Sequence, residues 1–257
     1  MQGGWRKYGE GPSRAVVLHG GPGGAGEVAP LARELGIRGY RVLEPFQTRR
    51  SVAEQVEELA EQITAACAPP VAVIGWSWGA WLGCLLASRR GRLVETLVLV
   101  GSGPFDARHA KRIRATKMSR LSEAERRELS VLDPREGDAM QVARFIELSD
   151  RSDSYARDGS PLPEVIFDGA IHSAVWPEAD RMRRDGTLLR EIGTIRSPVT
   201  ALHGDHDPRP SEGVRAPLAA ALPAARFVLI DRCGHKPWQE VYARDVFFDE
   251  LEAALAR

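Results

Sequence analysis

Short apolar runs along this chain alternate with longer stretches in which apolar residues recur every three or four positions. The short runs predict buried β-strands at 14–19, 41–46, 71–76, 95–100, 198–203 and 226–231. The longer stretches predict helices at 27–36, 52–67, 78–90, 212–222 and 241–256. Strands and helices in this order favour an α/β fold, with a mostly parallel twisted sheet, right-handed crossovers and helices on its faces.

The alternation stops after the fourth predicted strand and resumes only with the fifth. The stretch between them is charged and helix-prone and is divided by prolines, and Ser122 followed by Glu125 forms a capping pattern that predicts the start of one helix. We therefore predict one α/β core, made of residues 1–103 and 191–257, and a helical insertion over residues 104–190.

Length and composition agree with one such domain. A chain of 257 residues can bury a sizeable core but is too short for two large domains. Its 35 basic and 35 acidic residues cancel, so nothing predicts attraction to nucleic acid or to an anionic membrane.

Cys67, Cys84 and Cys233 lack C-x-x-C spacing, and the first two fall in predicted helices, which favours free thiols in a reducing cytoplasm. Residues 1–13 lack the apolar segment of a signal peptide, and no apolar run is long enough to span a bilayer.

The sequence Gly75-Trp76-Ser77-Trp78-Gly79 lies between a predicted strand and a predicted helix. This is the G-x-S-x-G pattern of a nucleophile elbow, in which a sharp turn exposes the serine hydroxyl. Glycines two residues to either side leave room for so tight a turn. Taken alone, the pattern also fits an ordinary core strand whose serine caps the next helix.

Two polar clusters supply the other groups that an activated serine needs. His203–Pro208 follows the strand at 198–203, and Cys233-Gly234-His235 follows the strand at 226–231. Carboxyl ends of parallel strands meet at one edge of a sheet, so these side chains are expected near Ser77. Their order, serine, acid, histidine, is that of an elbow-based triad. Several carboxylates in these clusters or at the end of the strand before them could be the acid: Asp205, Asp207 and Asp231.

A glycine loop, His19-Gly20-Gly21-Pro22-Gly23-Gly24, follows the first long strand. Its bare backbone can aim an N–H group at a developing oxyanion, and the backbone N–H of Trp78 would be the second donor. The loop lacks both G-x-x-x-x-G-K-[ST] and G-x-G-x-x-G, which disfavours phosphate binding. The cluster His203, Asp205, His206 and Asp207 lacks a recognised metal-ligand spacing, so we predict neither a metal nor a cofactor.

From about Ser13 onward the chain resembles the α/β-hydrolase superfamily. The H-G-G-P-G run at 19–23 is most similar to the proline iminopeptidase branch, and Gly-His-x-Pro-Trp at 234–238 is similar to the pattern around the catalytic histidine. Members of the superfamily carry a helical cap at the place of the 104–190 insertion, which implies a lid that decides substrate choice. A solvated decoration without substrate contact is the alternative.

The resemblance also implies roles for particular residues. The family places its acid three residues after the glycine that ends the strand, here Gly204. The implied roles are Ser77 as nucleophile, Asp207 as acid, His235 as base, and Gly21 with Trp78 as oxyanion hole.

Two departures weaken the iminopeptidase assignment. Few residues precede the first core strand, so the usual opening hairpin must be short or missing, and Pro45–Arg50 replaces the Asp-Gln-Arg-Gly segment of that branch. Four acidic residues of the insertion could bind a substrate amine, although no spacing singles one out: Glu147, Glu164, Asp168 and Glu178.

The sequence thus predicts a serine hydrolase that cleaves a small apolar ester through an acyl-enzyme. Trp76, Trp78, Trp81 and Phe46 suggest an apolar mouth, although tryptophans beside the elbow fit core packing equally well. Phe46 and Trp176 are the candidate substrate contacts, and Trp176, with its apolar neighbours Ile171 and Val175, could instead pin the insertion to the core. N-terminal peptide or amide cleavage and carbon–carbon bond hydrolysis remain alternatives, as does a non-catalytic hydrolase fold that binds a ligand or a protein partner. The expected partner is a small-molecule substrate, and the oligomeric state stays open.

Overall fold

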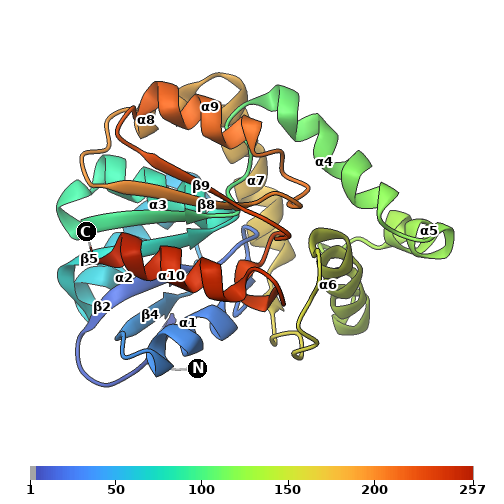
Figure 1. The fold of residues 1–257 in the computed structure, drawn as a ribbon, viewed down its shortest axis with the longest axis horizontal. Helices are drawn as coiled ribbons and strands as arrows, with labels where there is room; N and C mark the ends of the chain where they lie inside the picture. Colours follow the sequence, from blue (N-terminus) through green and yellow to red (C-terminus); the bar gives the residue numbers. More distant parts are fainter. Residues whose placement is uncertain (1–3, 257) are drawn as a thin grey trace.

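The computed structural model describes residues 4–256, which form a central sheet with helices on both faces (Figure 1). The seven-stranded sheet has the order β1-β4-β2-β5-β6-β8-β9, and every neighbouring pair except β1 and β4 is parallel. In sheet order the strands are Trp5–Tyr8, Val42–Pro45, Ser13–Leu18, Cys67–Trp76, Val94–Val100, Val199–Gly204 and Arg226–Ile230.

All six predicted strands are present, each within a few residues of its predicted bounds. The sequence pattern missed β1, a four-residue edge strand that runs antiparallel to β4. Alternate residues of β2 point into two different cores: Val16 and Leu18 into one, Ala15 and Val17 into the other. This arrangement explains why the central strands read as continuous apolar runs, since a parallel sheet is buried on both faces.

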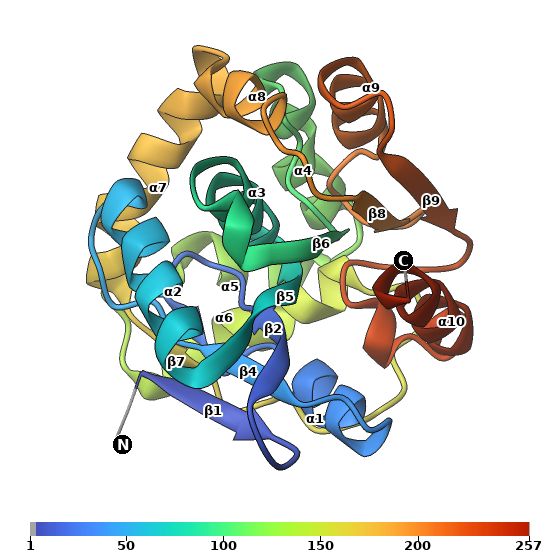
Figure 2. The same cartoon turned by 90° about the vertical axis from the view of Figure 1, so that its left-hand side faces the viewer.

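Helices cover both faces of the sheet, and all five predicted helices are present. They are α1 (Ala29–Ile37), α2 (Val52–Ala66), α3 (Trp78–Arg89), α9 (Glu212–Ala221) and α10 (Arg244–Leu255). Apolar residues of α2, α3 and α9 belong to one core cluster, and those of α1 and α10 belong to the other. Figure 2 shows α2 and α3 on one side of the sheet and α1 and α10 on the opposite side.

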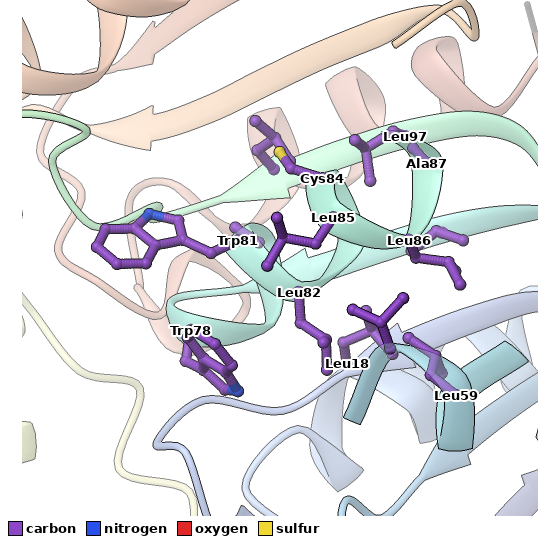
Figure 3. Packing of buried hydrophobic residues seen from close by; sticks show 14 of the residues in the cluster. Leu18, Leu59, Trp78, Trp81, Leu82, Cys84, Leu85, Leu86, Ala87 and Leu97 are labelled. Carbon is purple, nitrogen blue, oxygen red and sulfur yellow. The ribbon is translucent and has the colours of Figure 1, made fainter. Parts of the chain in front are cut away.

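The helix α3 is apolar on all sides, because it packs between the sheet and its neighbouring helices. Figure 3 shows its side chains from Trp78 to Ala87 surrounded by residues of other elements, among them Leu18, Leu59 and Leu97. This helix begins directly after Ser77, so its burial fixes the position of that residue.

The prediction that Cys67 lies in a helix was wrong, because α2 ends at Ala66 and Cys67 begins β5. Pro69 and Pro70 follow it, and proline has no backbone N–H with which to continue a helix. Cys84 does lie in α3, and Cys67, Cys84 and Cys233 are all free thiols. Among residues 4–256 no helix combines the length and the apolarity needed to cross a membrane.

Between β6 and β8 the chain forms a helical insertion. Its elements are α4 (Ala107–Ser119), α5 (Glu123–Val131), α6 (Ala139–Asp153), β7 (Ile166–Phe167), α7 (Gly169–Arg184) and α8 (Thr187–Ile192). The capping box at the start of α5 is present, with Ser122 and Glu125 bonding reciprocally. In Figure 1, α4, α5 and α6 extend away from the carboxyl edge of the sheet.

The insertion contains two different environments. The buried residues of α7 join the core cluster of α2 and α3, whereas α4 and α5 contain no buried residue. The two-residue strand β7 pairs with β3 (Gly24–Ala25), which links the insertion to the glycine loop. We propose that 104–190 forms the cap, with α4 to α6 as the part that covers the sheet edge.

Candidate active site

Ser77 lies at a sharp turn between the end of β5 and the start of α3. Its backbone has φ 56° and ψ −115°, a conformation that residues other than glycine rarely adopt. A β-carbon at position 75 would lie 2.2 Å from the carbonyl oxygen of Gly79, and one at position 79 would lie 2.5 Å from that of Leu18. Both glycines are therefore required for the turn, as the motif predicted.

His235 is hydrogen-bonded to Asp207 in the buried interior of the site. The two atoms His235 Nδ1 and Asp207 Oδ2 are 2.7 Å apart, and both side chains are almost fully buried. The second oxygen of Asp207 accepts the backbone N–H of Arg209 at 2.9 Å. The other ring nitrogen, His235 Nε2, is buried and has no hydrogen-bond partner within residues 4–256. This nitrogen is thus free to accept a proton, and His235 and Ser77 line the same cavity.

The rival carboxylates lie elsewhere. Asp205 accepts the backbone N–H of Cys233 at 3.1 Å, so it shapes the loop that precedes His235. Asp231 is exposed and pairs with Arg232. Asp207 is the carboxylate in contact with the imidazole, at the position that the family spacing implied.

The backbone of His235 is fixed by contacts from three parts of the chain. Its N–H donates to the carbonyl oxygen of Asp153 at 2.9 Å, and its carbonyl oxygen accepts the indole N–H of Trp76 at 2.8 Å. The rings of Trp76 and His235 are 4.8 Å apart between centroids. A β-carbon at position 101 would lie 2.7 Å from His235 Nδ1, so the residue directly after β6 must be glycine. These contacts leave the imidazole little freedom to turn.

The surroundings shift the pKa values of both partners. Burial alone would raise the pKa of Asp207, but the charge and hydrogen bond of His235 and the nearby Arg209 hold that pKa below its usual value. Burial lowers the pKa of His235, and the Arg209 cation lowers it further, against the opposing effect of Asp207. At neutral pH the pair is therefore a carboxylate and a neutral imidazole, which is the state of a general base.

Of the two predicted oxyanion donors, Trp78 follows Ser77 in the chain and Gly21 lines the same cavity as Ser77. Gly21 lines the cavity and has φ 109°, and a β-carbon there would lie 2.7 Å from the backbone nitrogen of Gly23. Trp78 is the first residue of α3, so its N–H is one of the helix donors that have no intrahelical acceptor. His19 supports the loop through the 2.8 Å contact of Nδ1 with the carbonyl oxygen of Gly20, and burial lowers its pKa to about 4, which keeps it neutral.

A cavity of about 890 Å³ lies between the sheet edge and the insertion. Its volume is within the range of small-molecule sites. Ser77 and His235 line one side of it. Apolar residues of the insertion line the other side: Ile113, Met118, Leu129, Val131, Leu132, Phe145, Ile146, Val165 and Phe167.

Charged residues line the cavity close to His235, which the sequence pattern did not predict. They are Glu27, Lys117, Asp150, Asp153, Arg209 and Lys236. Lys236 Nζ lies 3.3 Å from Glu27 and 3.0 Å from Asp150, and Arg209 Nη1 lies 2.8 Å from Asp153. The pairs join residues far apart in the chain, so no local motif signals them. The cavity lining therefore combines ion-paired charges close to His235 with apolar side chains of the insertion, which itself contributes both kinds of residue.

The aromatic residues expected at the mouth are mostly core residues. Of the elbow tryptophans Trp76 lines the cavity, whereas Trp78 and Trp81 belong to the core cluster around α3 (Figure 3). Trp176 stacks on Trp81 with ring centroids 5.9 Å apart. Phe46 is 7% exposed and lies against the guanidinium of Arg6. Neither Trp176 nor Phe46 is among the residues that line the cavity.

The four acidic residues considered for an amine lie outside the cavity lining. Glu147 pairs with Arg144, Asp168 caps α7, and Glu178 accepts the backbone N–H of Val52 at 2.9 Å. His203, from the cluster considered for a metal, contacts the carbonyl oxygen of Arg209 through Nε2 at 2.7 Å. Within the described chain no group of three or more His, Cys, Asp or Glu side chains is arranged to hold a metal ion.

Comparisons with known proteins agree with this architecture. The family model described as "alpha/beta hydrolase fold" matches residues 48–238, well over half of the chain. The chain therefore belongs to the alpha/beta hydrolase family, and its fold class is the one that the sequence predicted. The match supports hydrolase activity.

Individual proteins that are similar to this chain share a low sequence identity with it. The chain is 26% identical over 193 residues, 74% of each protein, to a pimeloyl-[acyl-carrier protein] methyl ester esterase of Nitrosomonas europaea. Among solved structures it is similar to VinJ, with a TM-score of 0.68, 19% identity and coverage of 97% of this chain and 94% of that one. It is also similar to MGS-MChE2, an alpha/beta hydrolase enzyme from a lagoon-sediment metagenome, with a TM-score of 0.61, 20% identity and coverage of 97% and 92%. The structural matches support the fold alone.

Proposed function

We propose that this protein is a carboxylic ester hydrolase that uses Ser77 as nucleophile, His235 as general base and Asp207 as the acid that orients the base. The observation that carries the proposal is the convergence of the strained Ser77 turn and the buried His235–Asp207 pair on one cavity. The family match and the distant esterase relative support the reaction class.

The proposed reaction has two steps. His235 Nε2 takes the proton of the Ser77 hydroxyl as its oxygen attacks the ester carbonyl, and the backbone N–H groups of Gly21 and Trp78 bind the oxyanion. The imidazolium then gives its proton to the leaving alcohol, which leaves an acyl group on Ser77. Water, deprotonated by the same imidazole, releases the acid and restores the serine. Asp207 stabilises the imidazolium at both stages.

The cavity suggests which part of a substrate lies where. The acyl chain fits against the apolar residues that α4 to α6 contribute, such as Ile113, Leu129 and Phe145, and a polar group near the ester fits the charged residues next to His235. Each acidic residue of the lining pairs with a cation, for example Asp150 with Lys236 and Arg157. An incoming substrate amine would have to displace such a partner, which favours an ester over the aminopeptidase alternative.

A carrier-linked ester is a second candidate substrate. The helix α4 carries no acidic residue and five basic ones: Arg108, Lys111, Arg112, Arg114 and Lys117. Of these, Arg114 and Lys117 line the cavity. A basic helix at the cavity suits an acyl chain delivered by an acidic carrier protein. The N. europaea relative is named for an ester of that type.

Two measurements test the proposal. A fluorophosphonate probe should label the wild type but not Ser77→Ala, and hydrolysis by that variant should fall by up to about 10⁶-fold while the fold remains. Ser88→Ala is the matched control, since Ser88 pairs with Thr194 at the far end of α3. Retained turnover in Ser77→Ala would disprove the assignment. A panel of p-nitrophenyl esters of increasing chain length, beside proline and alanine p-nitroanilides and a carrier-linked ester, then separates the substrate classes.

A further inference from the structure

Asp153, the last residue of α6, connects the insertion to both members of the His235–Asp207 pair. Its backbone oxygen accepts the N–H of His235 at 2.9 Å, and its Oδ1 lies 2.8 Å from Arg209 Nη1. Arg209 in turn donates its backbone N–H to Asp207, and its Nη1 lies 3.6 Å from Asp207 Oδ1. Asp153 is 6% exposed, so its charge interacts with these groups away from bulk water.

We propose that Asp153 is a positioning residue that balances the charge of Arg209 beside Asp207 and so sets the basicity of His235. This inference rests on the proposed function, because it treats His235 as the general base. It assigns to the end of α6, a helix of the insertion, a direct part in the chemistry of the core.

The carboxylate of Asp153 is one of the charged groups around His235 that influence how readily the imidazole is protonated. Asp207 is hydrogen-bonded to the ring, and Arg209 and Asp153 are the next charges. Lys117 of α4 lies 3.2 Å from Asp153 Oδ1 and shares its charge. Lys236, which follows His235 in the chain, forms ion pairs with Glu27 and Asp150. The guanidinium of Arg209 disfavours an imidazolium nearby, and the carboxylate of Asp153 opposes this effect.

The pKa directions agree with this geometry. Burial lowers the pKa of His235 and Arg209 lowers it further, whereas Asp207 and Asp153 raise it. Burial alone would raise the pKa of Asp153, but Arg209 and Lys117 hold it below its usual value, so the carboxylate is charged at neutral pH. Removing that charge leaves Arg209 less compensated beside the base.

The variant Asp153→Asn tests the charge, because it keeps the side-chain size and the backbone oxygen that holds His235. The pH dependence of kcat/KM for a p-nitrophenyl ester, and of the rate of fluorophosphonate labelling, would be measured. A lower pKa makes His235 neutral, and so active, at lower pH. We expect the acidic limb of the profile, the pH range over which kcat/KM rises as His235 loses its proton, to move to lower pH by roughly half to one unit. The plateau value of kcat/KM at higher pH should fall several-fold, because the base is weaker.

The opposite variant should move the limb the other way. Arg209→Gln removes the cation, so the pKa of His235 should rise and the acidic limb should move to higher pH. The double variant should lie close to the wild type. Asp150→Asn is the matched control, a buried carboxylate of the same helix that pairs with Lys236 and Arg157 instead of Arg209. It should lower the melting temperature without a comparable shift of the limb.

The outcomes separate the charge role from a purely structural one. If the limb of Asp153→Asn coincides with the wild type, or if Asp153→Asn and Arg209→Gln shift in the same direction, the inference is wrong. Should Arg209→Gln fail to fold, Asp153→Asn still decides. If the wild type is never labelled, the proposed function fails instead. A proton NMR titration of the His235–Asp207 hydrogen bond then shows independently whether Asp153 sets the pKa.

Discussion

Around Ser77 the chain is shaped by backbone contacts that leave no room for side chains, whereas around His235 it is held by hydrogen bonds and ion pairs that reach into the insertion. The elbow depends on Gly75, Gly79 and the buried helix α3, which lie in one short segment, and on the close approach of Gly79 to the carbonyl oxygen of Leu18. The histidine depends on Trp76, Asp153 and Asp207, which lie far apart in the sequence.

The difference means that the insertion contacts the surroundings of His235 but not the turn at Ser77. The steric contacts of the Ser77 turn do not involve α4 to α6, so we expect changes in those helices to leave this turn in place. The histidine loop does touch the insertion, both at Asp153 and through Glu240, whose carboxylate accepts the backbone N–H groups of Gly234, Tyr155 and Ala156. Changes in the insertion can therefore alter the contacts of His235 without altering the turn at Ser77.

The largest expected effect in this comparison comes from Asp207→Asn. The variant keeps the shape of the side chain but no longer fixes the tautomer of His235 or stabilises the imidazolium. The rate should fall by about 10⁴-fold if this pair behaves as in serine proteases, with the fold largely intact. Asp205→Asn is the control and should cost far less activity, because Asp205 bonds to the backbone of Cys233. If the two variants exchange these effects, the acid has been assigned to the wrong residue. Steady-state kinetics on a p-nitrophenyl ester measures both.

On the nucleophile side, Gly75→Ala should disrupt the elbow. Its added β-carbon would lie 2.2 Å from the carbonyl oxygen of Gly79, a contact that only a backbone shift can relieve. We expect a loss of about 3 kcal/mol or more of unfolding free energy and greatly reduced labelling of Ser77. Gly91→Ala is the matched control, since a β-carbon there has open space around it. Chemical denaturation and probe labelling of both variants give the answer, and a stable, fully reactive Gly75→Ala would contradict the steric account.

The same contrast explains what could be predicted from the sequence. The six strands and the G-x-S-x-G turn depend on local periodicity and local sterics, so they can be recognised in short windows. The pairing of Asp207 with His235 required a family spacing after Gly204. Asp153 with Arg209, and Lys236 with Glu27, gave no signal, because ion pairs between distant segments depend on how the folded elements meet. Trp176 was expected at the substrate for its apolar neighbours, a pattern that core packing produces equally well.

The smallest expected effects come from two apolar residues of the insertion, one that packs in the core cluster and one that lines the cavity. Trp176 packs on Trp81 and the core cluster and does not line the cavity, so Trp176→Ala should lower the unfolding free energy by about 2 kcal/mol and leave acyl-chain preference unchanged. Phe145 does line the cavity, from α6, and Phe145→Ala should change the preference among esters several-fold with a smaller loss of stability.

Melting curves and kcat/KM across the ester panel measure both effects. The comparison depends on the two variants differing in kind, because one removes a contact within the core and the other removes part of the cavity wall. If Trp176→Ala instead alters acyl preference at an unchanged melting temperature, then Trp176 contacts the substrate, as the sequence predicted. In that case α7 contributes to specificity together with α4 to α6, and the cavity must extend toward the core cluster when substrate is bound.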